Sequence, residues 1–114
     1  MPSDREHLAL FDIRDNILLA REFVSGLSED AFRSDRRSFY AVTRCLEIIS
    51  EAARRLSPEL RARYPQLPWR EIMGAGNIYR HDYDNVVEAF VWRTVHQSLA
   101  PLLTMVLAEL ATKG

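Results

Sequence analysis

The chain has 114 residues, a formal net charge of −1, 27% charged residues and 47% apolar residues, which predict one folded domain over 1–114 and exclude a disordered chain. It has no apolar run long enough to span a membrane, no signal-peptide core at its start and one cysteine, so we expect a cytoplasmic protein without an internal disulfide. Fourteen of the 15 basic residues are arginine, but the near-neutral charge argues only against a broad basic surface for nucleic acid, and leaves room for a small phosphate-handling site.

The first predicted helix begins at residue 3 or 4 and ends near residue 26. Ser3 and Glu6 have the spacing of a capping box, and Gly26 and Ser28 are typical of a helix end. Residues 29–35 are mostly polar and predict a connection with about one helical turn. The apolar side chains of the helix recur every three or four positions and predict one buried face: Leu10, Ile13, Ile17, Ala20, Val24 and Leu27.

A second long helix is predicted over residues 37–56. Its apolar stripe is wide, which is typical of a helix packed inside a bundle. Cys45 lies on this stripe, so we expect a buried small hydrophobe rather than a reactive thiol. The stripe consists of Val42, Cys45, Ile49, Ala52 and Leu56, and is widened by Leu46 and Ala53.

Two short helices follow. Ser57 and Pro58 supply an N-cap and a proline at the first helical position, and this helix ends before Pro65. Residues 68–71, Pro-Trp-Arg-Glu, repeat the start pattern. Gly74 and Gly76 weaken the helix that begins there without necessarily ending it, and they allow another backbone or a substrate to come close.

A long C-terminal helix completes the predicted fold. Asn85 and Glu88 have capping-box spacing at its start, and Pro101 is expected to kink it. No segment alternates with a period of two. We therefore predict an all-α fold, a mostly antiparallel up-down bundle of about five helices. The apolar stripe of the last helix is Val91, Val95, Leu99, Leu102, Val106 and Leu110.

Residues able to carry chemistry are concentrated in 74–84. On a continuing helix, Asn77 and His81 lie on one face because they are four residues apart. His81 suits general acid–base catalysis, Arg80 suits stabilisation of charge on a phosphate, and Asp82 could orient the imidazole. The same segment also contains Gly76, Tyr79, Tyr83 and Asp84.

Other interpretations of this segment remain open from the residues alone. A histidine beside acids at a helix end is often a capping or surface group. A metal site from His81, Asp82, Asp84 and His96 lacks a recognised ligand spacing. The glycines do not follow a strand and lack the third glycine of a dinucleotide fingerprint. We expect neither a metal nor a cofactor.

Several short motifs, which occur along the chain in the family's order, together resemble the HepT-like branch of HEPN domains over nearly the whole chain. The most specific of them is His-Xaa-Tyr at His81 and Tyr83, preceded by Asn77 at four residues. The others are Glu-Ala-Ala-Arg-Arg-Leu at 51–56, Pro-Trp at 68–69, Val-Trp at 91–92, and Leu99 with Pro101.

The resemblance implies a five-helix, mostly up-and-down bundle that forms a homodimer. It also implies the toxin of a type VII HEPN–MNT toxin–antitoxin pair, acting as a metal-independent endoribonuclease on RNA. The family motif is an arginine, a polar residue and, a few residues later, a histidine; here these last two are Asn77 and His81. The antitoxin is an MNT-type nucleotidyltransferase that transfers AMP from ATP onto the tyrosine two residues after the histidine, here Tyr83.

The chain departs from the family motif at one position. The family arginine directly precedes the polar residue, and Gly76 stands there. Arg80 is the nearby arginine left to take its role in the ribonuclease hypothesis. Two alternatives follow: a catalytically weak or inactive HEPN module that binds its nucleotidyltransferase partner or RNA, and a structural bundle in which His81 and Tyr83 only pack or cap.

Overall fold

The computed structural model describes residues 3–75 and 86–112, and these residues form helices joined by short turns and loops, with no strand among them. The helices are α1 (Asp4–Val24), α2 (Glu29–Ser34), α3 (Arg36–Arg55), α4 (Pro58–Ala62), α5 (Trp69–Gly74), α6 (Val86–Arg93), the π-helical turn η2 (Thr94–Ser98) and α7 (Leu99–Ala111). The all-α prediction is therefore confirmed. None of the described helices has the length and apolarity that crossing a membrane requires.

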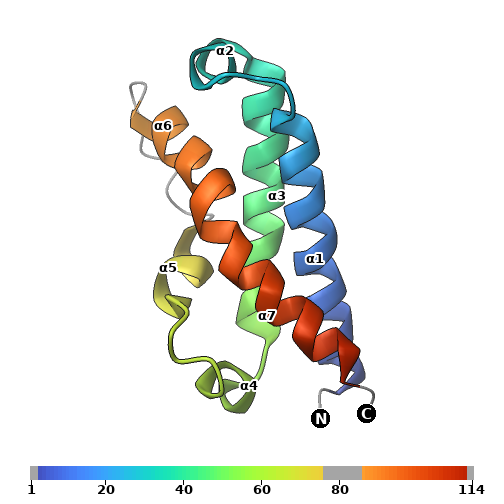
Figure 1. Ribbon diagram of the computed structural model, residues 1–114. Helices are drawn as coiled ribbons and strands as arrows, with labels where there is room; N and C mark the ends of the chain where they lie inside the picture. The colour runs from blue at the N-terminus through green and yellow to red at the C-terminus, as the bar shows by residue number, and fades with distance from the viewer. Residues whose placement is uncertain (1–2, 76–85, 113–114) are drawn as a thin grey trace.

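Three long helical pieces form the bundle (Figure 1). Helix α1 packs along α3, and α7 runs across the front of both, while α2, α4 and α5 are short connecting helices. The predicted C-terminal helix is the continuous run α6–η2–α7. Its regular register changes to a π-helical turn that ends three residues before Pro101, whose missing backbone N–H predicts a distortion of the preceding turn.

The helix starts follow local capping chemistry. The hydroxyl of Ser3 accepts from the N–H of Glu6 while the Glu6 carboxylate accepts from the N–H of Ser3, which is the predicted capping box. Ser28, Asp35 and Ser57 cap α2, α3 and α4 in the same way. The hydrogen bond from the backbone N–H of Ser38 lowers the pKa of the Asp35 carboxyl.

The predicted stripes form one core. Every predicted core position on α1 and α3 is buried, including Cys45, whose desolvation raises the pKa of its thiol. Leu27 and Leu110, at the ends of their stripes, are only partly buried. The ring of Trp92 packs, tilted by 44°, against the fully buried ring of Phe32 with centroids 5.5 Å apart, so α2 covers the top of the core more closely than its polar sequence predicts.

Candidate functional site

The residues predicted to carry chemistry lie outside the described residues. They are Gly76, Asn77, Tyr79, Arg80, His81, Asp82, Tyr83 and Asp84. Their roles and the predicted helix through them therefore stay predictions. The structure does describe both flanks, since α5 leads into this segment and α6 follows it. The described part of the candidate site therefore consists of these two flanks.

Helix α3 holds the upstream flank. The hydroxyl of Ser50 donates to the carbonyl oxygen of Ile72 at 2.8 Å, and the guanidinium of Arg54 donates to the carbonyl oxygen of Met73. The last carbonyls of a helix have few partners within it, so these side chains help to satisfy the C-terminal turn of α5, where the Ile72 carbonyl also accepts from the backbone N–H of Ala75. At its other end, the indole of Trp69 donates to the carbonyl oxygen of Tyr64 at 3.0 Å. Helix α5 is thus tied at both ends, although none of its residues is fully buried.

The space beside Gly74 is open. A Cβ atom added there would meet no atom within 4 Å. The glycine therefore does not serve close packing against another backbone in the part of the chain described here. The open space leaves room for a substrate, and Gly74 lies three residues before Asn77, the first of the predicted catalytic residues.

Helix α6 holds the downstream flank. Val87 and Val91 are buried in the core, which fixes the helix that follows the segment. One carboxylate oxygen of Glu88 is buried and has no hydrogen-bond partner within the described residues. The sequence assigns Glu88 only a capping role, with Asn85, which lies outside the described residues. An unsatisfied buried carboxylate oxygen is unusual and marks this flank as a polar one.

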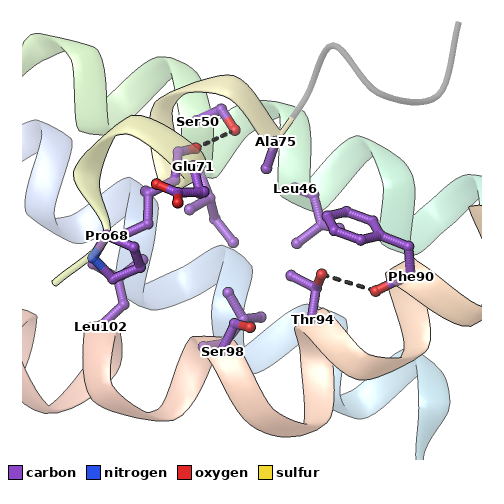
Figure 2. Close-up of a pocket in the computed structure, with 12 residues that line it drawn as sticks. Leu46, Ser50, Pro68, Glu71, Ala75, Phe90, Thr94, Ser98 and Leu102 are labelled. Atoms are coloured by element: carbon purple, nitrogen blue, oxygen red, sulfur yellow. Dashed lines mark hydrogen bonds between the residues drawn. The ribbon is translucent and has the colours of Figure 1, made fainter.

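A pocket of about 290 Å³ lies between the two flanks, enclosed by α3, α5, α6, η2 and α7 (Figure 2). The lining is mostly apolar. Two hydroxyls in it already donate to backbone carbonyls: Ser50 to Ile72, and Thr94 to Phe90 at 2.8 Å. The lining residues are Leu46, Ile49, Ser50, Pro68, Glu71, Ile72, Ala75, Phe90, Thr94, Ser98, Leu99 and Leu102. Sequence periodicity marks several of these as core but does not predict a cavity among them.

His96, a candidate in the metal alternative, contacts Trp92. Its Nδ1 is hydrogen-bonded to the carbonyl oxygen of Trp92 at 2.8 Å, and the two rings lie 4.0 Å apart. These contacts account for its position on the exposed side of η2. No group of three or more possible metal ligands occurs among residues 3–75 and 86–112.

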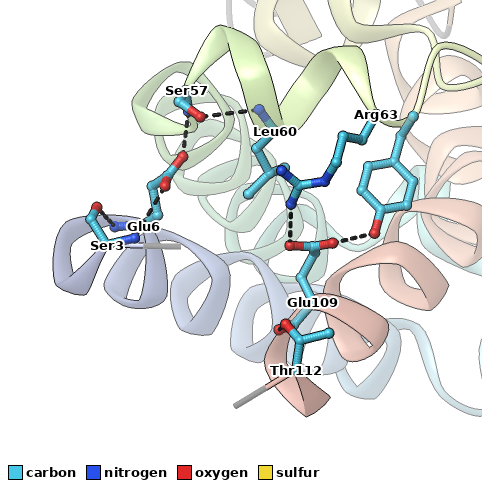
Figure 3. A network of polar contacts seen from close by, with 8 residues as sticks. Ser3, Glu6, Ser57, Leu60, Arg63, Glu109 and Thr112 are labelled. Atoms are coloured by element: carbon cyan, nitrogen blue, oxygen red, sulfur yellow. Dashed lines mark hydrogen bonds and ion pairs between the residues drawn. The ribbon is translucent and has the colours of Figure 1, made fainter. Parts of the chain in front are cut away.

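A polar network ties α4 to α1 and α7 (Figure 3). Glu109, only 5% exposed, accepts from Arg63 at 2.7 Å and from the hydroxyl of Tyr64, and this hydrogen bond raises the pKa of Tyr64. The carboxylate of Glu6 accepts from the N–H of Ser57 at 2.7 Å, and hydrogen bonding from Ser57 lowers the pKa of Glu6. Because it links three helices at the chain ends, the network stabilises the fold rather than forming part of the candidate site.

Comparison with known proteins points to one family. A family model described as "Ribonuclease HepT-like" matches residues 13–108. This match includes both flanks and the whole segment between them. It also covers the core stripes of α3 and α6 and most of that of α7.

Individual relatives agree with the family match. "Putative RNase MJ1380" of Methanocaldococcus jannaschii is 32% identical over 90 residues, which is 79% of this chain and 83% of that protein. "Probable ribonuclease HepT" of Thermococcus cleftensis is 32% identical over 93 residues, covering 82% of this chain and 84% of the relative. No solved structure matches the chain.

Proposed function

Because the chain belongs to the HepT-like ribonuclease family, we propose that it is the toxin of a HEPN–MNT toxin–antitoxin pair and a metal-independent endoribonuclease. The observation that carries this proposal is the family match over residues 13–108, which contains Asn77, His81 and Tyr83 with the motif spacing. The fold supports it, because the helices on both sides of residues 76–85 are held in place: α5 by hydrogen bonds from α3, and α6 by its buried valines.

In the proposed reaction, the 2′-oxygen of a ribose attacks the adjacent phosphorus and the 5′-oxygen of the next nucleotide leaves. One proton is taken from the 2′-hydroxyl and one is given to the departing 5′-oxygen, and His81 acts as base or acid in this transfer. Arg80, with Asn77, stabilises the negative charge that develops on the phosphate oxygens. Asp82 orients the imidazole of His81, and Tyr79 helps to position the segment that carries these residues. The products carry a 2′,3′-cyclic phosphate, or a 3′-phosphate after hydrolysis, and a 5′-hydroxyl.

The proposed regulation is AMP transfer by the antitoxin. The phenolic oxygen of Tyr83 attacks the α-phosphorus of ATP, pyrophosphate leaves, and the phenolic proton is lost. The product places a phosphodiester two residues from His81, where its negative charge opposes the approach of an RNA phosphate. An MNT-type nucleotidyltransferase is the partner that this modification requires.

The homodimer is supported by the solvent face of α1. Five large apolar side chains are exposed along it, and exposed apolar patches of this kind mark protein interfaces. Near the middle, Arg14 donates to Asp15 at 2.9 Å. An antiparallel pairing of two α1 helices brings each Arg14 near Asp15 of the second copy, so the face suits a two-fold interface. The exposed apolar residues are Leu8, Phe11, Leu18, Leu19 and Phe23.

One observation favours a second candidate function. Gly76 stands where the family has arginine, so the chain could bind RNA or its nucleotidyltransferase without cutting. End-group analysis separates the two functions: purified protein incubated with RNA in EDTA is expected to give cyclic or 3′-phosphate ends. Intact RNA, recovered bound to the protein, would favour the binding module.

A further inference from the structure

The pocket beside the candidate segment has the position of a substrate subsite. Ala75, in its wall, is the last described residue before the predicted catalytic residues, and Phe90 comes from the helix that follows them. A group that reaches the pocket therefore lies next to Ala75, which directly precedes the predicted catalytic segment in the sequence. This inference rests on the proposed function and assigns a ligand to that same site.

The size and lining of the pocket suit a flat ring. An apolar cavity of about 150 Å³ accommodates benzene. The present pocket, at about 290 Å³, has room for a larger heterocycle such as a nucleobase. Phe90 supplies an aromatic ring in the wall (Figure 2), and single-stranded RNA is commonly recognised by stacking of bases on such rings.

The polar groups of the pocket restrict which base fits. Ser50 and Thr94 already use their hydroxyl protons on the carbonyls of Ile72 and Phe90. Glu71 and Ser98 remain, and neither side chain is bonded to another residue in the described ranges. An ionised carboxylate only accepts hydrogen bonds, so Glu71 favours a ligand that presents an N–H group.

We propose that this pocket binds a nucleobase of the RNA that carries an exocyclic amino group. The base lies against Phe90, and its amino group donates to the carboxylate of Glu71, in the way that acidic side chains recognise N4 of cytosine. Uracil carries a carbonyl oxygen in place of that amino group, and its one ring N–H, at N3, lies between two carbonyl oxygens that oppose the carboxylate, acceptor against acceptor. The subsite thus gives the ribonuclease a preference for sites next to cytosine, adenine or guanine over uracil.

Cytidine and uridine provide a matched pair of probes, because their rings differ only along the C4–N3 edge: cytosine has an amino group at C4 and an unprotonated N3, whereas uracil has a carbonyl at C4 and an N–H at N3. Each nucleoside is titrated into full-length protein and followed by amide chemical shifts in two-dimensional NMR. We expect shifts at Ile72, Ala75, Thr94 and Ser98, with cytidine binding about tenfold more tightly than uridine. Equal affinities, or shifts confined to other residues, would overturn the proposal.

Three variants locate the binding. Ser98→Trp places a large ring at the exposed rim of the pocket and should abolish the cytidine shifts, whereas Gln97→Trp, on the neighbouring exposed position outside the lining, should leave them. Glu71→Gln changes only an exposed carboxylate, so the protein should fold, and it should remove most of the cytidine preference. Retained preference in Glu71→Gln would contradict the assignment of Glu71.

The readouts separate this inference from the proposed ribonuclease activity. Nucleoside binding by His81→Ala protein requires no cleavage, so its loss or retention tests the pocket alone. If wild-type protein binds cytidine selectively but cuts no RNA, the proposed activity fails and the pocket stands. If it cuts RNA with no bias against sites next to uridine and no selective nucleoside binding, the pocket proposal fails and the activity stands.

Discussion

The hydroxyl of Ser50 on α3 lies 2.8 Å from the carbonyl oxygen of Ile72 on α5 and donates a hydrogen bond to it. Ile72 lies four residues before Gly76, the position at which the chain departs from the family motif. Ser50 has no exposed surface, so this hydrogen bond forms in the packed interior. A buried side chain of α3 thus sets where the candidate segment begins.

Removing this hydrogen bond should impair cleavage by disturbing the start of the segment. Ser50→Ala removes the side-chain donor of the Ile72 carbonyl, which keeps only the backbone N–H of Ala75, and a typical hydrogen bond contributes about 0.5–1.5 kcal/mol. We expect a lower kcat for RNA cleavage with a smaller change in KM. Ser34→Ala is the control, because Ser34 donates to the carbonyl of Asp30 within α2 at an exposed position. Equal kcat values in the two variants would show that Ser50 does not position the segment.

The Glu109 network should contribute strongly to stability. Glu109→Ala leaves Arg63 and the Tyr64 hydroxyl without their acceptor, and hydrogen bonds to charged groups contribute about 1.5–3 kcal/mol. Chemical denaturation should show a loss of this size, against less than about 0.5 kcal/mol for Glu51→Ala at an exposed position of α3. Tyr64→Phe should cost less in the Glu109→Ala background than in wild type; additive losses would exclude a coupling between the two side chains.

The contact between Glu6 and Ser57 should make the stability of the fold depend on pH in the acid range. Hydrogen bonding from Ser57 lowers the pKa of Glu6 below its ordinary value of 4.5, so the ionised form stabilises the fold. That contribution is present above pH 4.5 and is lost as the pH falls through the lowered folded-state pKa. The melting temperature of Glu6→Gln should therefore fall less than that of wild type between neutral pH and pH about 3. Parallel melting curves for the two proteins would rule out this contribution.

The exposed face of α1 should control self-association. Leu18, 49% exposed, lies on this face, and Leu18→Glu introduces a charge that is costly to bury in an interface. We expect the molar mass from light scattering to fall from dimer to monomer. Tyr40→Glu provides a control, since Tyr40 is 61% exposed on α3 and outside the α1 face. An unchanged mass for Leu18→Glu would place the dimer interface elsewhere.

Most of the fold follows from local sequence patterns. Three-four spacing predicts the buried faces of α1, α3 and α7, and capping residues such as Ser3 and Ser57 predict helix starts, because both act within one or two turns. Helix α2 is only partly predicted. Phe32 is its one fully buried residue, and its burial depends on contact with Trp92, sixty positions along the chain.

The site is less predictable from local patterns. The hydrogen bonds from Ser50 and Arg54 to α5 join residues about twenty positions apart, and nothing in the spacing of either helix indicates them. The pocket requires five helical elements to meet, and Glu71 gains significance only from its place in that wall. The roles of Asn77, Arg80, His81 and Tyr83 rest on the family motif, and they stay predictions.

Cleavage of RNA by purified protein in EDTA, compared between wild type and His81→Ala, tests the central claim most directly. We predict that wild-type protein yields fragments with cyclic or 3′-phosphate ends and that His81→Ala does not. His96→Ala serves as the matched control, because His96 is an exposed histidine held by Trp92 on η2, and this variant should cut like wild type. Absence of cleavage by wild-type protein, or equal cleavage by His81→Ala, would contradict the proposed ribonuclease mechanism.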